Sequence, residues 1–215
     1  MTLATRAELI DEVQSWLFGR DDIAIKVPTF IRMFEAKANR ILRCRQMEER
    51  ATAVVDILVG MPEFISLPDD FQTMRRVRMP EETHTRTLKF AVPSQLDALR
   101  EQNNAAGTPE FFTVFGTQLE LYPTPNAATV LEMIYRRTLS PLVEATDTNW
   151  LLDVAPDLYL YGTLMEAAPY LHEDERIPTW ASGVQGGFAD LNKLSDDATY
   201  NAGPLVIRRR RGGYS

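Results

Sequence analysis

Residues 111–122 read Phe111-Phe112-Thr113-Val114-Phe115-Gly116-Thr117-Gln118-Leu119-Glu120-Leu121-Tyr122, and this stretch decides the fold class. Two runs rich in aromatic and aliphatic residues flank the dipeptide Gly116-Thr117. A glycine at the first central position supplies the positive φ of a type II′ turn, whose twist matches that of two paired strands. The stretch therefore predicts a β-hairpin.

Strand-like segments surround this hairpin on both sides. Leu67-Pro68-Asp69-Asp70-Phe71 predicts a turn, because proline fixes φ and aspartate side chains bond nearby backbone. A short helix is expected from Pro93 to about Gln102, ended by Gly107-Thr108-Pro109. The other segments with strand character are 52–57, 63–67, 74–79, 85–90 and 129–135. Residues 51–138 are thus predicted to form a mostly β insertion.

Helical patterns precede the insertion. Thr5 and Glu8 have the spacing of a capping box, which predicts a helix start. A second helix is expected to begin near Pro28, because the missing N–H of proline costs nothing in a first turn. The apolar residues that recur at helical spacing are Leu9, Ile10, Val13, Trp16 and Leu17, then Phe30, Ile31, Phe34, Ala38, Ile41 and Leu42.

Helical patterns return after Trp150, where Pro156 is expected in a first turn. A last helix is predicted from about Glu173 to Leu194. Its pattern contains Gly183, Gly186 and Gly187, and each glycine within a helix costs about 0.5–1 kcal/mol relative to alanine. The glycines predict either close helix packing or a break in the helix.

The predicted fold class is therefore α+β: an antiparallel helical bundle with a β-rich insertion and an extended C-terminal arm. The bundle is expected from residues 1–50 and 139–198, since each apolar stripe must bury against another. Residues 51–138 form the insertion and residues 199–215 the arm.

Composition limits the function classes. The chain of 215 residues is 45% hydrophobic and 25% charged, as in an ordinary globular protein, and one cysteine, Cys44, fits a reducing compartment. No secretory signal opens the sequence, and the acids between Leu151 and Leu171 argue against a membrane span. The net charge of −7 argues against a simple sequence-independent DNA-binding protein. The segment from Glu144 to Asp197 carries eleven acids against Arg176 and Lys193.

Motifs for catalysis, cofactors or metals are not evident. His172 lies in His172-Glu173-Asp174-Glu175-Arg176, where consecutive residues point in different directions and fit an acidic first helical turn better than a metal site. His84 lies in a polar turn. Gly183-Val184-Gln185-Gly186-Gly187 lacks the spacing and the lysine of phosphate-binding loops. We therefore expect no catalytic, cofactor-binding or metal-binding residues.

Basic residues are the remaining candidates for a binding surface. On the second helix they could face a protein partner, phosphates or water alone: Arg32, Lys37, Arg40, Arg43 and Arg45.

A second basic group ends the chain. Its apolar triplet, Leu205-Val206-Ile207, has no apolar partner in the polar tail and is followed directly by four arginines. This pattern favours docking as an added strand on another protein. The alternative is a frayed terminus. The residues of this candidate arm are Pro204, Leu205, Val206, Ile207, Arg208, Arg209, Arg210 and Arg211.

Several phrases, in this order and spacing, resemble a known family. They are Leu67-Pro68-Asp69-Asp70-Phe71, Gly107-Thr108-Pro109-Glu110-Phe111-Phe112, Leu119-Glu120-Leu121-Tyr122-Pro123-Thr124-Pro125, Tyr135-Arg136-Arg137, Thr148-Asn149-Trp150-Leu151-Leu152, Ala155-Pro156-Asp157-Leu158-Tyr159-Leu160-Tyr161-Gly162, Glu166-Ala167-Ala168-Pro169-Tyr170-Leu171 and Asp174-Glu175-Arg176. From Ala51 to about Leu194 the chain resembles the head-to-tail adaptor (connector) proteins of tailed bacteriophages, of the short-tailed-phage type.

The resemblance implies a structural virion protein, made in the host bacterial cytoplasm, that forms a dodecameric ring. Such a ring docks onto the portal protein, continues the DNA channel and carries the tail or nozzle protein. The C-terminal arm would bind the portal, and double-stranded DNA would pass through the lumen without sequence-specific binding. The acidic segment 144–197 would line either that lumen or the contacts between subunits. The alternatives are another connector or tail-completion component, a nucleic-acid-binding module that uses the arginine-rich segments, and a hydrolase without a recognisable motif.

Overall fold

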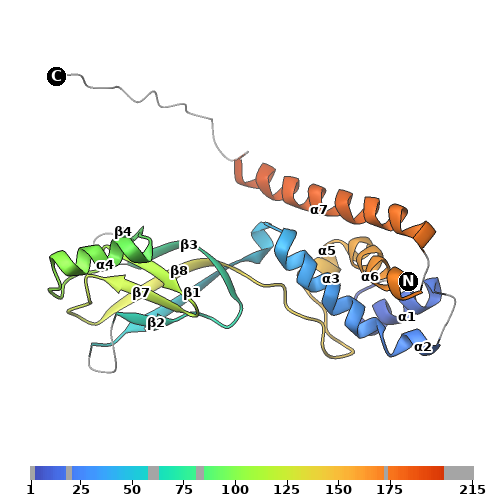
Figure 1. Ribbon diagram of the computed structural model, residues 1–215, viewed down its shortest axis with the longest axis horizontal. Coiled ribbons are helices and arrows are strands. Elements are labelled where there is room, and N and C mark those ends of the chain that lie inside the picture. The colour runs from blue at the N-terminus through green and yellow to red at the C-terminus, as the bar shows by residue number, and fades with distance from the viewer. Residues whose placement is uncertain (1–2, 18–20, 58–62, 81–84, 172–173, 201–215) are drawn as a thin grey trace, which may run out of the picture. The chain divides into compact units, whose positions relative to one another are not determined.

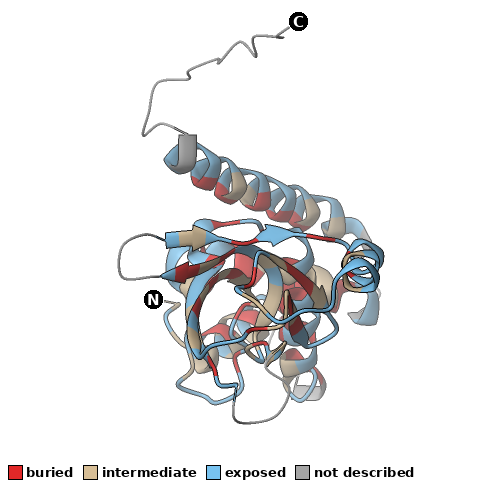
Figure 2. Ribbon diagram, turned by 90° about the vertical axis from the view of Figure 1, so that its left-hand side faces the viewer, coloured by how far each residue is buried: buried red, intermediate tan, exposed pale blue. Residues whose placement is uncertain are grey.

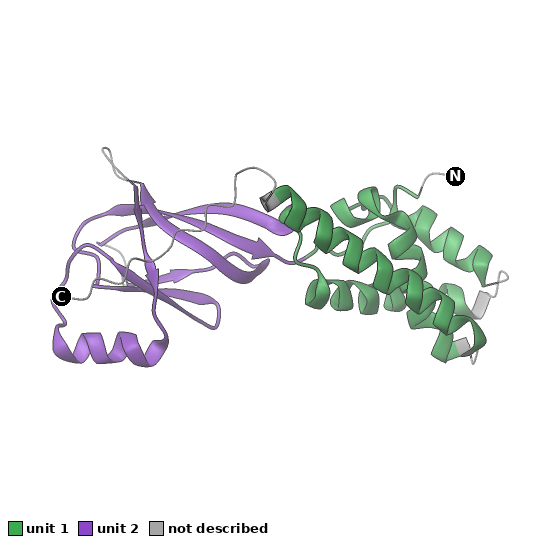
Figure 3. Ribbon diagram, turned by 90° about the horizontal axis from the view of Figure 1, so that it is seen from above, with its two compact units in different colours: residues 1–45, 139–215 green, residues 46–138 purple. Residues whose placement is uncertain are grey.

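Two units make up the structure, a computed structural model that describes residues 3–17, 21–57, 63–80, 85–171 and 174–200. Contacts group residues 1–45 with 139–215 as a helical unit, and residues 46–138 as a β unit (Figure 3). The α+β class predicted from the sequence is confirmed.

The hairpin that decided the fold class is present. β6 (Phe111–Phe115) pairs with β7 (Gln118–Tyr122) in antiparallel register, with Phe111 opposite Tyr122 and Phe115 opposite Gln118. Gly116 has a φ of 59°, a positive value at which a residue with a side chain would be strained. The predicted turn glycine is therefore required by the backbone.

Two sheets build the β unit, each with four strands among the described residues. The first has the order β1 (Glu48–Val55), β8 (Thr129–Arg137), β3 (Phe71–Pro80), β4 (Thr85–Thr87) and is antiparallel throughout. The second has the order β2 (Phe64–Ser66), β7, β6, β5 (Lys89–Phe90), and β5 runs parallel to β6. Strand alternation lets both sheets send apolar side chains into one shared core. That core contains Val55, Leu67, Val77, Met79, Leu88, Phe112, Leu119, Leu121, Leu131 and Met133.

Helix α4 (Pro93–Gln102) packs against β6 and β7. Its buried Leu96 contacts Tyr122. The Tyr122 hydroxyl donates to the Asn103 carbonyl at 2.7 Å and also lies 3.0 Å from the Leu99 carbonyl, at the end of the helix. The bounds of α4 agree with those predicted from Pro93 and Gln102.

The helical unit is organised around α6 (Pro156–Leu171), which contacts α1, α3, α5 and α7 (Figure 1). The bounds of the other elements are α1 (Arg6–Trp16), α2 (Asp21–Ala24), α3 (Val27–Ile41), the 3₁₀ turn η1 (Arg45–Met47), α5 (Trp150–Val154), the 3₁₀ turn η2 (Asp174–Arg176) and α7 (Ile177–Tyr200). No helix among these described elements is both long and apolar enough to cross a bilayer.

The last helix corrects the sequence prediction. It begins at Ile177 after a 3₁₀ turn and continues through its glycines to Tyr200, so it ends six residues beyond the predicted Leu194 and includes residues 199 and 200, which were predicted to belong to the arm. A Cβ on Gly187 would lie 3.0 Å from Leu158, and one on Gly183 would lie 3.1 Å from Tyr161. Close packing against α6 is therefore the correct reading of these glycines. Buried positions of α7 lie along its inner side (Figure 2).

The predicted capping box is present in altered form. Thr5 Oγ1 accepts the Glu8 N–H at 3.4 Å, as expected for an N-cap. The Glu8 carboxylate accepts instead from the Ala4 N–H, at 2.7 Å. The carboxylate therefore binds one residue earlier than the box predicts.

Candidate functional site

A buried polar network fixes the segment 139–149, which returns the chain from the β unit to the helices. Glu35 of α3 accepts two hydrogen bonds on Oε1, from the Leu142 N–H (2.9 Å) and from the Tyr159 hydroxyl (2.8 Å). Asn149 Nδ2 donates to the same Tyr159 hydroxyl and to the Ser140 carbonyl, both at 2.8 Å. One carboxylate on α3 and one tyrosine on α6 therefore hold the segment at Leu142 and at Asn149, and Asn39 Oδ1 accepts the N–H of Leu139 at 2.6 Å.

Burial governs the electrostatics of this network. Glu35 is 4% exposed, and this burial raises the pKa of its carboxyl above the ordinary value. The two hydrogen bonds, and the positive charges of Arg32 and Arg6, act in the opposite direction. Burial, followed by the charge of Glu35, also raises the pKa of Tyr159, so the hydroxyl stays protonated as a donor.

Two further side chains attach the segment. Asn149 Oδ1 accepts the Leu152 N–H at 3.0 Å and so caps α5. Asp147 Oδ2 accepts the N–H groups of Val143 (2.8 Å) and Glu144 (2.7 Å), and these bonds lower the pKa of Asp147. The segment therefore has a defined backbone path against the helices.

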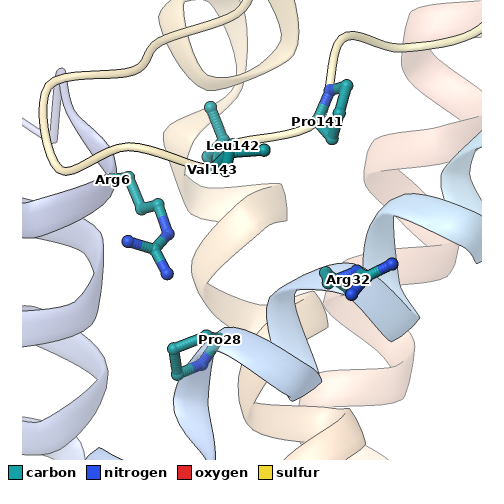
Figure 4. A pocket seen from close by; sticks show the side chains of 6 residues that line it. All are labelled: Arg6, Pro28, Arg32, Pro141, Leu142 and Val143. Carbon is teal, nitrogen blue, oxygen red and sulfur yellow. The ribbon is translucent and has the colours of Figure 1, made fainter.

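The outer side of this segment forms a pocket with α1 and α3. Its volume is about 410 Å³, and Figure 4 shows its lining side chains. They are Arg6 from α1, Pro28 and Arg32 from α3, and Pro141, Leu142 and Val143 from the segment. Two guanidinium groups thus border a hollow whose other walls are apolar.

Neither guanidinium forms an ion pair within 4.0 Å of a carboxylate of the described residues, although both charges act on Glu35 and that of Arg6 also acts on Asp147. Arg6 Nε is buried and has no hydrogen-bond partner. Arg32 is exposed and forms no ion pair within the described part of the chain. A buried cationic donor without an acceptor costs free energy, and a bound anion would offset that cost. The arrangement can accept a carboxylate that is attached to an apolar group.

The structure separates the five basic residues predicted as an interface face. Arg32 lines the pocket, and Arg40 is exposed on the same helix. Lys37 lies on the side of α6, 3.4 Å from Glu166. Arg43 and Arg45 follow α3, and their backbone N–H groups donate to Asn192 (2.8 Å) and Ser195 (2.9 Å) of α7.

The predicted portal-binding arm, Pro204–Arg211, lies outside the described residues, as does His172. The described residues contain no group of three or more histidine, cysteine and acidic side chains that could hold a metal ion.

A second cluster of arginines lies on the first sheet of the β unit. Glu132 Oε1 of β8 accepts from Arg78 of β3 at 2.6 Å and lies 2.9 Å from Arg50 of β1. The pKa of Glu132 is lowered, mainly by the hydrogen bond from Arg78. Arg75 of β3 likewise lies 3.1 Å from Glu48 of β1, so the positive charge of this sheet is partly neutralised by cross-strand ion pairs.

Several site residues were not predicted from the sequence: Arg6, Glu35, Pro141, Leu142, Val143 and Tyr159. They come from two distant parts of the chain, residues 6–35 and residues 141–159, so no local motif links them. Among the residues of this network, only Asn149 could have been predicted from the sequence, as an N-cap residue, because an asparagine directly before an apolar run is typical of a helix start.

Comparison with protein-family models gives one match. The model of the family described as "SU10 adaptor protein" matches residues 2–208 of the chain. Comparison with curated proteins gave no match.

Proposed function

The chain belongs to the SU10 adaptor protein family, a family of phage head-to-tail adaptors, and from this premise we propose that it joins the portal to the tail in the virion. The observation that carries the proposal is the extent of the match, which covers residues 2–208 of 215. The role is structural: the protein holds other virion proteins in place and has no catalytic step or cofactor.

The proposed working form is a dodecameric ring docked onto the portal. The ring continues the DNA channel and offers a platform for the tail or nozzle protein. Double-stranded DNA passes through its lumen without sequence-specific binding. The net charge of −7 per chain supports this last point, because an acidic ring repels the phosphate backbone.

The proposed attachment to the portal uses the arm Pro204–Arg211. Leu205, Val206 and Ile207 add to a portal sheet or enter an apolar groove, and Arg208–Arg211 pair with carboxylates. Many such arms on one ring bind cooperatively, because each engaged arm raises the effective concentration of the next.

The test compares the full chain with a chain that ends at Gly203, each mixed with portal rings and followed by light scattering. We expect the truncation to lose portal attachment and to keep the urea-unfolding curve of the full chain. Portal attachment of the truncated chain at full strength would overturn the arm.

Two matched variants separate the parts of the arm. Replacement of Leu205, Val206 and Ile207 by serine tests the apolar contact. Replacement of Arg208–Arg211 by glutamine tests the charges and removes most of the salt dependence of attachment. Tight binding of the full chain to duplex DNA, with a steep salt slope, would favour a nucleic-acid-binding module instead.

A further inference from the structure

The chemistry of the pocket bordered by Arg6 and Arg32 specifies the kind of surface that would fit it. Its apolar walls, Pro28, Pro141 and Leu142 among them, suit an aliphatic side chain. Its two guanidinium groups suit carboxylates on either side of that chain. The complementary surface is therefore an exposed aliphatic residue between two acids.

The outer side of α7 has this composition. Leu194 is 64% exposed, in contrast to the apolar residues on the inner side of the helix. Asp190 stands one helical turn before Leu194, and Asp197 stands nearly one turn after it. Residues at this spacing share one helix face. Both acids are exposed, and neither forms an ion pair within the described part of the chain.

A chain cannot bring these two surfaces together by itself. Within the helical unit, α7 and the segment 139–149 lie on opposite sides (Figure 1). A closed ring, however, is built from two different faces of each copy, so that one face of a subunit meets the other face of its neighbour. The pocket and the outer side of α7 are two such faces.

We propose that the Arg6–Arg32 pocket receives Leu194 of a neighbouring copy of the chain, with Asp190 and Asp197 of that copy paired with the two guanidinium groups. This inference rests on the proposed ring. The two guanidinium groups gain carboxylate partners, and the exposed leucine is removed from water. It also assigns acids of the segment 144–197 to contacts between subunits.

A charge-reversal pair tests the contact by mass photometry, on the chain alone and on portal rings. Arg32→Glu and Asp197→Arg should each weaken assembly by about tenfold or more, since each places like charges together. The double variant Arg32→Glu/Asp197→Arg should recover most of that loss. Arg40→Glu, on the same helix but outside the pocket, is the matched control and should assemble as the unaltered chain does.

A disulfide trap gives a second measurement that does not depend on charge. Val143→Cys lines the pocket, and Leu194→Cys lies on the outer side of α7. Under oxidation, the double variant should give a ladder of multimers on a non-reducing gel. Pairing Leu194→Cys with Ile25→Cys, which is 81% exposed, should give no such ladder.

The outcomes separate the inference from the proposed function. Rings that form on the portal with unimpaired Arg32→Glu and Asp197→Arg variants, and without the ladder, would overturn the pocket contact and leave the adaptor function standing. An unaltered chain that forms no ring, alone or on the portal, would overturn both.

Discussion

The ring of Phe34 in α3 occupies the space where Gly162 of α6 has no side chain. A Cβ built on Gly162 would lie 2.1 Å from ring carbons Cδ2 and Cε2 of Phe34. The same ring packs edge-on against Tyr159 (5.1 Å between centroids) and stacks on Phe188 of α7 (6.0 Å). This glycine therefore lets three helices meet around one aromatic side chain.

Gly162→Ala should destabilise the helical unit. The added methyl group forces the Phe34 ring out of its position, and such overpacking costs about 1–3 kcal/mol in the free energy of unfolding. Urea unfolding measures the loss. Gly186→Ala is the matched control: its Cβ would meet nothing within 4 Å, so it should stabilise α7 by about 0.5–1 kcal/mol. Equal effects of the two substitutions would contradict this account.

Glu35→Gln should change how stability depends on pH. Glutamine keeps an oxygen that accepts from Leu142 and Tyr159, but it does not titrate. In the unaltered protein burial raises the Glu35 pKa, so near and above pH 4.5 the folded state holds a proton that the unfolded state has lost. Its free energy of unfolding therefore falls as pH rises through this window, and the variant lacks that fall. Urea unfolding at several pH values measures the difference.

Glu35→Ala serves as the contrasting variant. It leaves the Leu142 N–H and the Tyr159 hydroxyl without their acceptor, at a cost of about 2–5 kcal/mol. If the free energy of unfolding of the unaltered protein and of Glu35→Gln depended on pH in the same way, burial would not raise the pKa of Glu35, and the prediction would be wrong.

Tyr159→Phe and Asn149→Ala should be coupled. Each removes one partner of the 2.8 Å bond between Asn149 Nδ2 and the Tyr159 hydroxyl, so the double variant loses less than the sum of the single losses. We expect single losses of about 1–3 kcal/mol and a coupling of about 1 kcal/mol in urea unfolding. Additive losses would mean that the two side chains act independently.

Glu132→Gln should make the β unit less sensitive to acid. The hydrogen bond from Arg78 lowers the Glu132 pKa, so below pH 4.5 the unfolded state takes up a proton before the folded state does. Stability present above that pH is lost as the pH falls through the lowered pKa. Urea unfolding between pH 3 and 6, about the ordinary carboxyl range, measures this slope. Glu110→Gln is the control, because Glu110 is 58% exposed and 3.8 Å from its arginine.

The sequence predicted the elements whose determinants are local. The β6–β7 hairpin follows from Gly116 and the runs beside it, and α4 follows from Pro93 and the breaker at Gly107. The continuity of α7 was not predictable, because the cost of its glycines is offset by contacts with Leu158 and Tyr161 on another helix.

The pocket was beyond prediction for the same reason. Arg6 and Arg32 are ordinary basic residues in their helices, and only the returning segment 139–149 makes them border one hollow. From the sequence alone, Glu35 has the pattern of a solvent-exposed helix residue. Its burial depends on Tyr159, which lies 124 positions later in the chain. Family membership, by contrast, was predicted from the order of short phrases along the chain, and the match of the family model over residues 2–208 confirms it.

The strands by which the chain enters and leaves the β unit are direct neighbours: β1 and β8 pair with Glu48 opposite Arg136. Their ends are thus separated by one strand spacing, about 5 Å. A short turn joining Arg45 to Leu139 could close that gap without rerouting any helix. The β unit is in this sense a separable insertion, whose removal would leave the connectivity of the surrounding helices unchanged.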